Sequence, residues 1–462
     1  MLMLLNSALQ QRIDAGIADR PGIQQITLPW TPGGHVPMLD WLHDATLYPQ
    51  FYWQHRDGAQ EAAASGGLLI FDRLSKAQDF LAAHSPAWPE LRLWGINAFG
   101  SEDDNGEDGE DENGCGNDDT PDDGAAEPES CLFLPRLTWE RDGQSHRLVL
   151  NLASDASLRD DAAQCLAWLR QAAPAMPLMP WSAQPHEEVH QPEHACWREM
   201  ISQALAAVGQ GALTKVVLAR RTRLGFRGHL NPHALMAASR RVNHDCYHYM
   251  LAWSAQSSFL GSSPERLYLR RGERLDTEAL AGTVASQSPS ANAGQLARWL
   301  MNDDKNQREN LLVVDDICQR LQAAVDTFDV MPPEIVRLRT VQHLRRAITA
   351  RLNSRDDARC LSMLQPTAAV AGLPRDAARA FIARHEPFDR QWYAGSAGYL
   401  SRERTEFCVS LRCALVERQS LWLYAGAGIV EGSDADREWQ EVNNKAAGLR
   451  TLFTGDKAAA PN

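Results

Sequence analysis

Three charged residues near the C-terminus are spaced so that they could act at one place. The segment "DREWQEVNNKAAG" at 436–448 contains Glu438, Glu441 and Lys445, three and four residues apart. On a helix this spacing puts the three side chains on one face. Glu441 and Lys445 also suit an ordinary solvent-exposed ion pair, worth about 0.2–0.5 kcal/mol. The spacing predicts a shared face and leaves open whether that face contacts solvent or a ligand.

A second group of residues suits the binding of a carboxylate. Read with the two-residue period of a strand over 406–430, Arg412 shares its face with small residues only. A guanidinium with room beside it can grip a carboxylate through two parallel hydrogen bonds, although a surface arginine on an edge strand has the same pattern. In the following "YAGAGIV", Gly426 and Gly428 would let backbone amides approach an anion.

Three further residues suit proton transfer or metal binding. Lys215 begins an apolar strand in "LTKVVLAR", where burial would lower the pKa of the amine and produce a base. Glu265 follows a Ser-Ser-Pro turn in "LGSSPERL", and Glu309 lies within a helical pattern in "DKNQREN". Each also has an ordinary structural explanation: a structural lysine, a helix cap, and a surface pair with Lys305. The segment "HDCYH" at 244–248 could mimic a metal site, but core packing is favoured.

Antiparallel strands and helices are expected to position these residues. Strand-like segments come as hairpins about "RDGQ", "RGE" and "ERQS", which favours antiparallel over parallel pairing. The segment "QLARWLMNDDKNQRENLLVVDDICQRLQAA" is expected to form one long helix. Its apolar stripe would comprise Leu296, Trp299, Leu300, Leu311, Val314, Ile317 and Leu321. The sequence predicts an α+β fold with large, mostly antiparallel β-sheets flanked by helices.

One acidic segment dominates the charge of the chain. The 462 residues have a net charge of −13, and 102–129 contain fourteen Asp and Glu but no Lys or Arg. Without that segment 59 − 14 = 45 acidic residues face 46 basic ones, so the rest is nearly neutral and gives no reason to expect a nucleic-acid partner. Because its Gly, Asn, Asp and Pro content buries little apolar surface, 102–129 is expected to be a disordered insertion rather than a site for a divalent ion or a basic partner.

The remaining composition indicates a soluble protein. No apolar run approaches the roughly 18–20 residues of a membrane span, and the first residues lack the features of a signal peptide. Nine cysteines without a CxxC motif suit free thiols, so a cytoplasmic location is expected. We expect an N-terminal α/β part at 1–190, a Pro-rich linker near 173–194, a catalytic region at 191–455 and a flexible tail at 456–462.

The order of motifs along the chain resembles that of the chorismate-utilising enzymes, which include anthranilate, aminodeoxychorismate, salicylate and isochorismate synthases. The matching segments are "KVVLAR", "GSSPERL", "TEALAGT", "DKNQREN", "PTAAVAGLPR", "WYAGSAGY", "LRCA", "YAGAGIV" and "EWQEVNNKAAG". They cover about 200–455. Towards the N-terminus, "YPQFYWQHRDG" and "LRLWGINAF" are most similar to the isochorismate synthases of the menaquinone pathway. The acidic insertion is the main departure from the family pattern.

The resemblance implies that chorismate is bound with Mg²⁺. Glu309 and Glu441 would hold the metal, with Glu438 in a second layer that retains water. The metal would face the ring carboxylate, and Arg412 with Tyr393 would hold the enolpyruvyl carboxylate. The residues that the resemblance assigns to substrate binding are Arg412, Lys445, Tyr393, Gly426, Gly428, Leu280 and Ala281.

The resemblance also assigns two proton transfers. Lys215 would be the base that activates a nucleophile for addition at C2, and Glu265 the acid that protonates the C4 hydroxyl as it leaves. This requires a neutral amine and a protonated carboxyl near pH 7, and burial shifts both groups in those directions. Members of the family that add ammonia typically carry glutamine where this chain has Lys215, and some carry a nucleophilic lysine where it has Ala281. Both differences favour water, and the chain contains no recognisable glutamine-hydrolysing domain, so an amidotransferase subunit is not expected to be obligatory.

The expected activity is therefore that of a Mg²⁺-dependent isochorismate synthase, an isomerase that supplies menaquinone biosynthesis. A salicylate synthase, which goes on to eliminate pyruvate, shares the same site residues and remains an alternative. An isochorismate synthase of a siderophore pathway is another alternative. A non-catalytic chorismate-binding relative would lack the base or the acid, and this chain has both Lys215 and Glu265.

Overall fold

The computed structural model describes residues 1–32, 37–100, 129–172, 175–180, 184–286 and 292–453. Nearly all of the acidic insertion and the whole of the expected C-terminal tail lie outside the described residues. A disordered insertion and a flexible tail therefore stay predictions.

Strands dominate the described part of the chain, and all their pairings are antiparallel. The strands are β1 (Gly22–Trp30), β2 (Gln50–Gln54), β3 (Gln60–Phe71), β4 (Arg92–Asn97), β5 (Ser130–Asp142), β6 (Ser145–Ser154), β7 (Glu187–Gln191), β8 (Lys215–Gly225), β9 (Tyr247–Ser254), β10 (Ser257–Ser263), β11 (Arg266–Arg271), β12 (Arg274–Ala285), β13 (Val325–Val330), β14 (Glu334–Arg337), β15 (Val341–Leu352), β16 (Gly372–Leu373), β17 (Ser396–Ser401), β18 (Arg404–Val409), β19 (Cys413–Glu417) and β20 (Ser420–Ile429). The predicted hairpins β5–β6, β11–β12 and β19–β20 are confirmed.

The strands form two long branches that meet at β5, from which β6 and β1 also extend. One branch runs β7–β8–β20–β19–β10–β9–β2–β3–β5. The other runs β5–β4–β17–β18–β11–β12–β15. Aromatic side chains of the two branches pack against one another: the ring centroids of Phe51 and Trp94 are 5.9 Å apart, and the edge-on rings of Trp53 and Tyr399 are 6.2 Å apart. A hydrophobic core therefore lies between two sheet layers.

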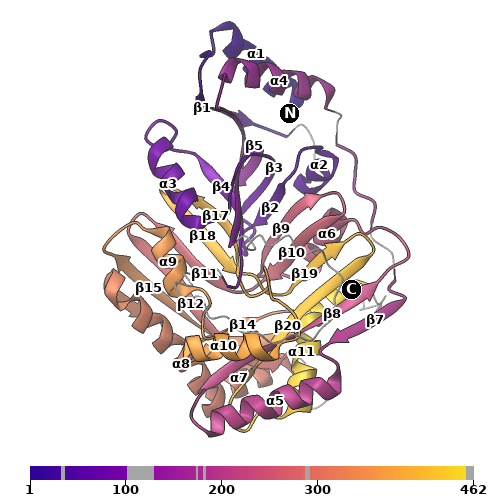
Figure 1. Ribbon diagram of the computed structural model, residues 1–462, viewed down its shortest axis with the longest axis vertical. Helices are drawn as coiled ribbons and strands as arrows, with labels where there is room; N and C mark the ends of the chain where they lie inside the picture. The colour runs from indigo at the N-terminus through magenta and orange to yellow at the C-terminus, as the bar shows by residue number, and fades with distance from the viewer. Residues whose placement is uncertain (33–36, 101–128, 173–174, 181–183, 287–291, 454–462) are drawn as a thin grey trace, which may run out of the picture.

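Helices cover the outer faces of these layers (Figure 1). They are α1 (Leu2–Asp14), α2 (Met38–Asp44), α3 (Leu74–His84), α4 (Leu158–Gln171), α5 (His194–Gly209), α6 (Pro232–Val242), α7 (Ala293–Asn302), α8 (Asp304–Leu321), α9 (Asp357–Leu364), α10 (Arg375–His385) and α11 (Ala435–Arg450). Helices α1 and α4 lie at one end of the molecule and α5 at the other (Figure 1). Buried residues of α5, α10 and α11 share a cluster with β8 and β20, so these helices fix that end of the sheet.

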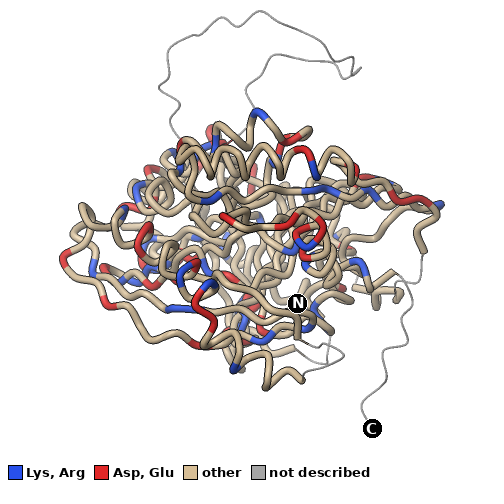
Figure 2. The backbone as a smooth tube through the Cα atoms, turned by 90° about the horizontal axis from the view of Figure 1, so that it is seen from below, with Lys and Arg blue, Asp and Glu red and all other residues tan. Residues whose placement is uncertain are grey.

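Charges of both signs lie intermixed along the described chain (Figure 2). This arrangement agrees with the near neutrality of the chain outside the acidic segment. Within the described residues, no helix combines the length and the apolar character needed to cross a membrane.

Two predicted elements are interrupted where polar residues cap or bend the backbone. The long helix is split into α7 and α8 because Asp303, at φ −83° and ψ 114°, leaves the helical conformation and its side chain caps α8 through the Asn306 amide. The predicted stripe is only partly buried: Leu300, Val314, Ile317 and Leu321 are buried, but Trp299 and Leu311 are exposed.

The segment 406–430 also departs from its predicted period. Strand β18 ends at Val409 and β19 begins at Cys413, because Arg412 adopts a left-handed backbone with φ 50°. The strand alternation used to orient Arg412 was therefore wrong, although its side chain does reach a cavity. Part of the expected linker is strand as well, since β7 pairs with β8.

Candidate active site

A cavity of about 320 Å³ lies between α8, α11 and the strands β8, β12 and β20. All twelve residues assigned from the sequence to catalysis, metal binding or substrate binding line it: Lys215, Glu265, Leu280, Ala281, Glu309, Tyr393, Arg412, Gly426, Gly428, Glu438, Glu441 and Lys445. These residues come from segments more than 200 positions apart. The fold therefore brings the whole predicted set to one place, while the role of each residue remains a prediction.

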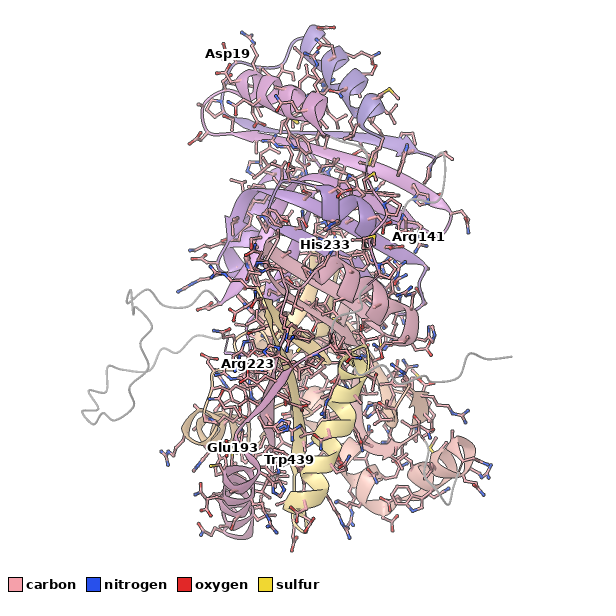
Figure 3. All side chains as sticks on the ribbon, turned by 90° about the vertical axis from the view of Figure 1, so that its right-hand side faces the viewer. Asp19, Arg141, Glu193, Arg223, His233 and Trp439 are labelled. Atoms are coloured by element: carbon pink, nitrogen blue, oxygen red, sulfur yellow. The ribbon has the colours of Figure 1, made fainter. Side chains whose placement is uncertain are left out.

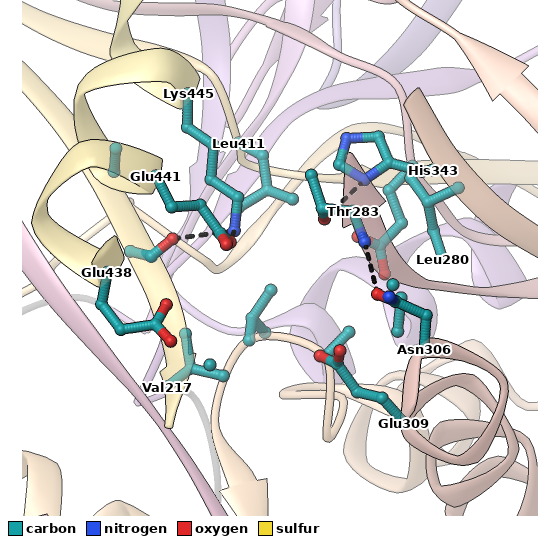
Figure 4. A pocket seen from close by; sticks show the side chains of 18 of the residues that line it. Val217, Leu280, Thr283, Asn306, Glu309, His343, Leu411, Glu438, Glu441 and Lys445 are labelled. Carbon is teal, nitrogen blue, oxygen red and sulfur yellow. Dashed lines mark hydrogen bonds and ion pairs between the residues drawn. The ribbon is translucent and has the colours of Figure 1, made fainter. Parts of the chain in front are cut away.

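Two carboxylates face each other across the cavity. Glu309 projects from α8 on one side, and Glu438 and Glu441 project from α11 on the other (Figure 4). Each potential ligand already has a lysine partner: Lys215 Nζ lies 3.0 Å from Glu309 Oε1, and Lys445 Nζ lies 2.7 Å from Glu441 Oε1. The helical face that contains Glu441 and Lys445 therefore contacts the cavity, and their pair is not an isolated surface ion pair.

The neighbours of Glu309 lower the pKa of its carboxyl group. Burial acts to raise the pKa of its carboxyl, but the charge and hydrogen bond of Lys215 and the charge of Lys445 outweigh burial and lower it. On α11, burial and the charge of Glu441 raise the pKa of Glu438 to about 7. The carboxyl group of Glu309 on α8 is therefore more acidic than that of Glu438 on α11, and both line the same cavity.

Glu265 lies between β10 and β11 and is 2% exposed. Burial first, and then the charge of Glu278, raise the pKa of its carboxyl to about 8, against the opposing charges of Lys215, Lys445 and Arg412. Its Oε1 atom has no hydrogen-bond partner among the described residues. The side chain is therefore a protonated acid near neutral pH, with an oxygen available to a ligand.

Helix α11 is fixed from behind by aromatic and cationic contacts. Its Trp439 lies beside the start of α5 (Figure 3), 4.8 Å from the ring of His194 between centroids. On the same side, the guanidinium of Arg220 from β8 lies 3.8 Å from the Trp439 ring and donates a hydrogen bond of 2.6 Å to Asn443. Trp439 and Asn443 are four residues apart on the face away from the cavity, so these contacts orient the acidic face inward.

Two hydrogen bonds hold the guanidinium of Arg412. Its Nη1 donates to the carbonyl oxygen of Lys445 at 2.9 Å, and its Nη2 lies 3.1 Å from His343 Nε2. Burial and the charges of Arg412 and Lys445 keep the pKa of His343 well below its usual value, so the ring is neutral. Because a guanidinium only donates, Nε2 is the acceptor and Nδ1–H donates to Thr283 Oγ1 at 3.0 Å.

Glycines on β20 make room for the side chains on this wall. A Cβ on Gly426 would lie 2.8 Å from the Tyr393 hydroxyl, and one on Gly428 would lie 3.0 Å from Lys215 Cε. The Gly426 carbonyl accepts a hydrogen bond of 3.0 Å from Lys445 Nζ. Small residues are thus required here by close packing, and anion binding by the two glycine amides remains a prediction.

A bulge in β12 shapes the opposite wall. Pairing with β15 shifts register between Leu280 and Thr283, where Gly282 has φ +86°. The Asn310 amide nitrogen from α8 lies 3.1 Å from the carbonyl oxygens of both Ala279 and Ala281. Because Asn310 follows Glu309, these bonds fix the helix that bears Glu309 against this bulge.

The donor chemistry of the cavity fits a hard divalent cation. Mg²⁺ is commonly held by one or two carboxylates while waters and substrate oxygens complete its octahedron, and the facing Glu309 and Glu441 satisfy that pattern. Within the described residues no three His, Cys, Asp or Glu side chains gather as a ready metal site. The cavity can therefore hold such an ion only together with water or ligand oxygens.

Sequence reasoning missed His343 and Thr283, which line the cavity and bond to each other. Thr283 ends the quoted motif "TEALAGT" but was given no role. A histidine within the apolar strand pattern "VQHL" was the available signal for His343, because a polar residue on a buried strand needs a partner. In the "HDCYH" segment, Cys246 and His248 are buried as expected, and His248 bonds to Ser262 Oγ at 2.9 Å. The expectation of core packing was wrong for His244, which is exposed and precedes β9.

Comparison with known proteins agrees with this geometry. A family model described as "Chorismate binding enzyme" matches residues 10–454. The isochorismate synthase MenF of Escherichia coli (strain K12) is 50% identical over 445 residues, which cover 96% of this chain and 97% of that protein. MenF of Haemophilus influenzae is 35% identical over 91% of this chain and 90% of its own.

Solved structures extend the similarity to the fold. The menaquinone-specific isochorismate synthase MenF from Escherichia coli aligns with a TM-score of 0.87 and 49% identity over 97% of this chain and 99% of its own. Anthranilate synthase component I from Streptococcus pneumoniae, at a TM-score of 0.61 and 22% identity over 92% of each chain, shares the fold. The predicted α+β fold of mostly antiparallel sheets is confirmed, and the chain belongs to the family of chorismate-binding enzymes.

Proposed function

We propose that this protein is an isochorismate synthase that converts chorismate to isochorismate and supplies menaquinone biosynthesis. The observation that carries the proposal is the buried Glu265, whose pKa is raised to about 8, in one cavity with Lys215 and the facing carboxylates of α8 and α11. The similarity to MenF of Escherichia coli along nearly the whole chain supports this activity over others in the family.

Glu309 and Glu441 would hold Mg²⁺, and the bound ion would neutralise the ring carboxylate of chorismate. Lys445, which bonds to both Glu441 and the Gly426 carbonyl, lies where it can add a second positive charge. Arg412 and Tyr393 would bind the enolpyruvyl carboxylate on the other side of the cavity. Because the backbone of Lys445 and the ring of His343 already hold the guanidinium, Arg412 is rigid before substrate arrives.

The two proton transfers would use the residues on either side of the substrate. Glu265 is protonated below pH 8, so it can donate its proton to the departing C4 hydroxyl. Lys215 lies in an ion pair with Glu309 in this structure, so its ammonium would have to leave that pair and release a proton to solvent before the neutral amine could accept one from water. The water oxygen would then bond to C2 as both ring double bonds shift and the C4–O bond breaks, and the departing oxygen would leave as water with the proton from Glu265.

Incubation with chorismate and Mg²⁺ in H₂¹⁸O, followed by mass spectrometry of the products, tests this proposal. Isochorismate carrying one ¹⁸O is expected. Salicylate with pyruvate would instead identify a salicylate synthase, and unchanged chorismate would refute both activities. Lys215→Ala and Glu265→Gln should abolish turnover, whereas Lys76→Ala, which removes an exposed lysine paired only with Asp72, should not.

Metal binding can be measured without turnover. Isothermal titration calorimetry with Mg²⁺ and a non-reacting aromatic dicarboxylate should give binding that Glu309→Gln and Glu441→Gln each weaken at least tenfold. The matched control is Glu403→Gln, which alters a solvent-exposed carboxylate outside the cavity. Equal Mg²⁺ binding by all four proteins would show that these glutamates are not the ligands.

A further inference from the structure

Two charged residues from distant parts of the chain form a buried pair behind Glu265. Arg56 lies in the turn between β2 and β3, and Glu278 lies on β12. Arg56 Nη1 is 2.6 Å from Glu278 Oε1 and Arg56 Nη2 is 2.8 Å from Oε2, so the contact is bidentate. Only 2% of Glu278 is exposed. Neither residue lines the cavity, and the proposed reaction gives neither one a role.

The pair holds the backbone on both sides of Glu265. Arg56 Nη1 also donates to the carbonyl oxygen of Pro264 at 3.2 Å. The backbone amide of Arg266 donates to Glu278 Oε1 at 2.8 Å. The residues immediately before and after Glu265 are thus tied to one ion pair, and this fixes the direction in which the Glu265 side chain leaves the backbone.

We propose that Arg56 and Glu278 are positioning residues for Glu265: they hold the junction between β10 and β11 from which the Glu265 side chain leaves the backbone, and they fix a second carboxylate beside it. This inference rests on the proposed role of Glu265 as proton donor. A buried ion pair adds little stability compared with apolar side chains of similar volume, so its placement around Glu265 is better explained by geometry and charge at that residue.

The charges around Glu265 come from four elements. Glu278 faces it from β12, while Lys215 from β8, Lys445 from α11 and Arg412 from the segment before β19 oppose it. Burial acts to raise the pKa of Glu278, but the charge and hydrogen bonds of Arg56 outweigh burial and lower it, so Glu278 stays ionised. Within the pair, Glu278 is the charge that acts on Glu265: it opposes the effect of the three cations and, after burial, is the second cause that disfavours ionisation of Glu265.

Two substitutions separate the effect of the Glu278 charge from the effect of the hydrogen bonds that hold the backbone around Glu265. Glu278→Gln removes the negative charge and leaves the Arg56 cation uncompensated, so the pKa of Glu265 should fall by about one unit. Arg56→Lys keeps the positive charge but replaces the bidentate guanidinium contact with a single ammonium. The pKa of Glu265 should therefore stay unchanged, while turnover should fall about tenfold with KM little changed. Asp161→Asn is the control, because it breaks a similarly bidentate pair with Arg136 that lies away from the cavity, and it should change neither quantity.

The pKa of Glu265 is read by infrared titration of its protonated carboxyl band, identified by the band's loss in Glu265→Gln. This readout needs no substrate, so it remains informative if chorismate is not converted, which would refute the proposed function alone. A Glu278→Gln protein that folds with an unchanged Glu265 titration would overturn the inference. If Glu278→Gln does not fold, Arg56→Lys decides: full turnover overturns the inference, and a tenfold loss with an unmoved titration supports it.

Discussion

Replacing Glu265 with glutamine should abolish activity and at the same time remove a pH-dependent cost to stability. The folded protein binds a proton at this carboxyl up to a pKa of about 8, while an unfolded glutamate releases it near 4.5. Between these values the folded state carries a proton that the unfolded state lacks, so the stability of the native protein falls as pH rises through this window. Glutamine has no proton to lose and no such dependence.

The size of the effect follows from the two pKa values. The interval from 4.5 to about 8, at 1.36 kcal/mol for each pH unit, sets an upper limit of about 5 kcal/mol. The free energy of unfolding of Glu265→Gln, relative to the native protein, should therefore improve by about 3–5 kcal/mol between pH 5 and pH 9. Any constant cost of burying the amide cancels in this difference. Urea unfolding of both proteins at pH 5, 7 and 9 measures it.

A matched control is Glu61→Gln. Glu61 is also buried, but the charges of Arg240 and Arg141 with the hydrogen bonds of Arg141 and Tyr52 outweigh burial and lower its pKa. Its carboxylate is ionised throughout the range from pH 5 to 9, so this variant should be less stable by a nearly constant amount. If the difference in free energy of unfolding between Glu265→Gln and the native protein were equally independent of pH, Glu265 would already be ionised at pH 5. It could then not serve as the acid.

Three other outcomes are expected. Lys215→Ala should lower kcat by about 10²–10⁴-fold in the ¹⁸O assay, the usual contribution of a proton-transfer group, and a smaller loss would assign the base elsewhere. Gly426→Ala should impair substrate binding, seen as a raised KM, because its Cβ would lie 2.8 Å from the Tyr393 hydroxyl and 2.9 Å from the Leu218 carbonyl; an unchanged KM would contradict this packing. Deleting 102–129 should leave turnover nearly intact, since Asn97 and Ser130 on either side of the segment already pair between β4 and β5; a large loss would show that the segment contributes to activity.

The sequence indicated which residues lie together better than it predicted the elements around them. The ordered motifs contain all twelve candidate residues, which line one cavity, because each motif combines a side chain with the turn or strand that presents it. The roles of these residues stay predictions. Local periodicity failed at Asp303 and Arg412, where one residue leaves the regular conformation. A side chain that caps a helix, or a left-handed backbone at a non-glycine residue, is decided by tertiary contacts that the pattern of apolar residues does not record.

The contacts that act behind the cavity were the hardest to foresee. Arg56 lies in the quoted segment "YPQFYWQHRDG", yet nothing in its neighbours indicates that it meets Glu278, 222 positions later. Arg220 and Trp439 are likewise brought together only by the packing of α11 on β8. Pairings between distant residues depend on strand register, which a single sequence leaves undetermined.

The joining of two sheet branches at β5 has a consequence for how the enzyme acquires activity. Partners in the first branch are far apart in sequence: Gln50 pairs with Ala252 and Ser420 pairs with Gly225. Such high contact order makes folding slow, because the entropy of closing long loops is lost before the contacts form. Glu265 lies where the chain crosses from β10 in one branch to β11 in the other. Activity should therefore return only in the slowest phase of refolding, after most secondary structure is already present.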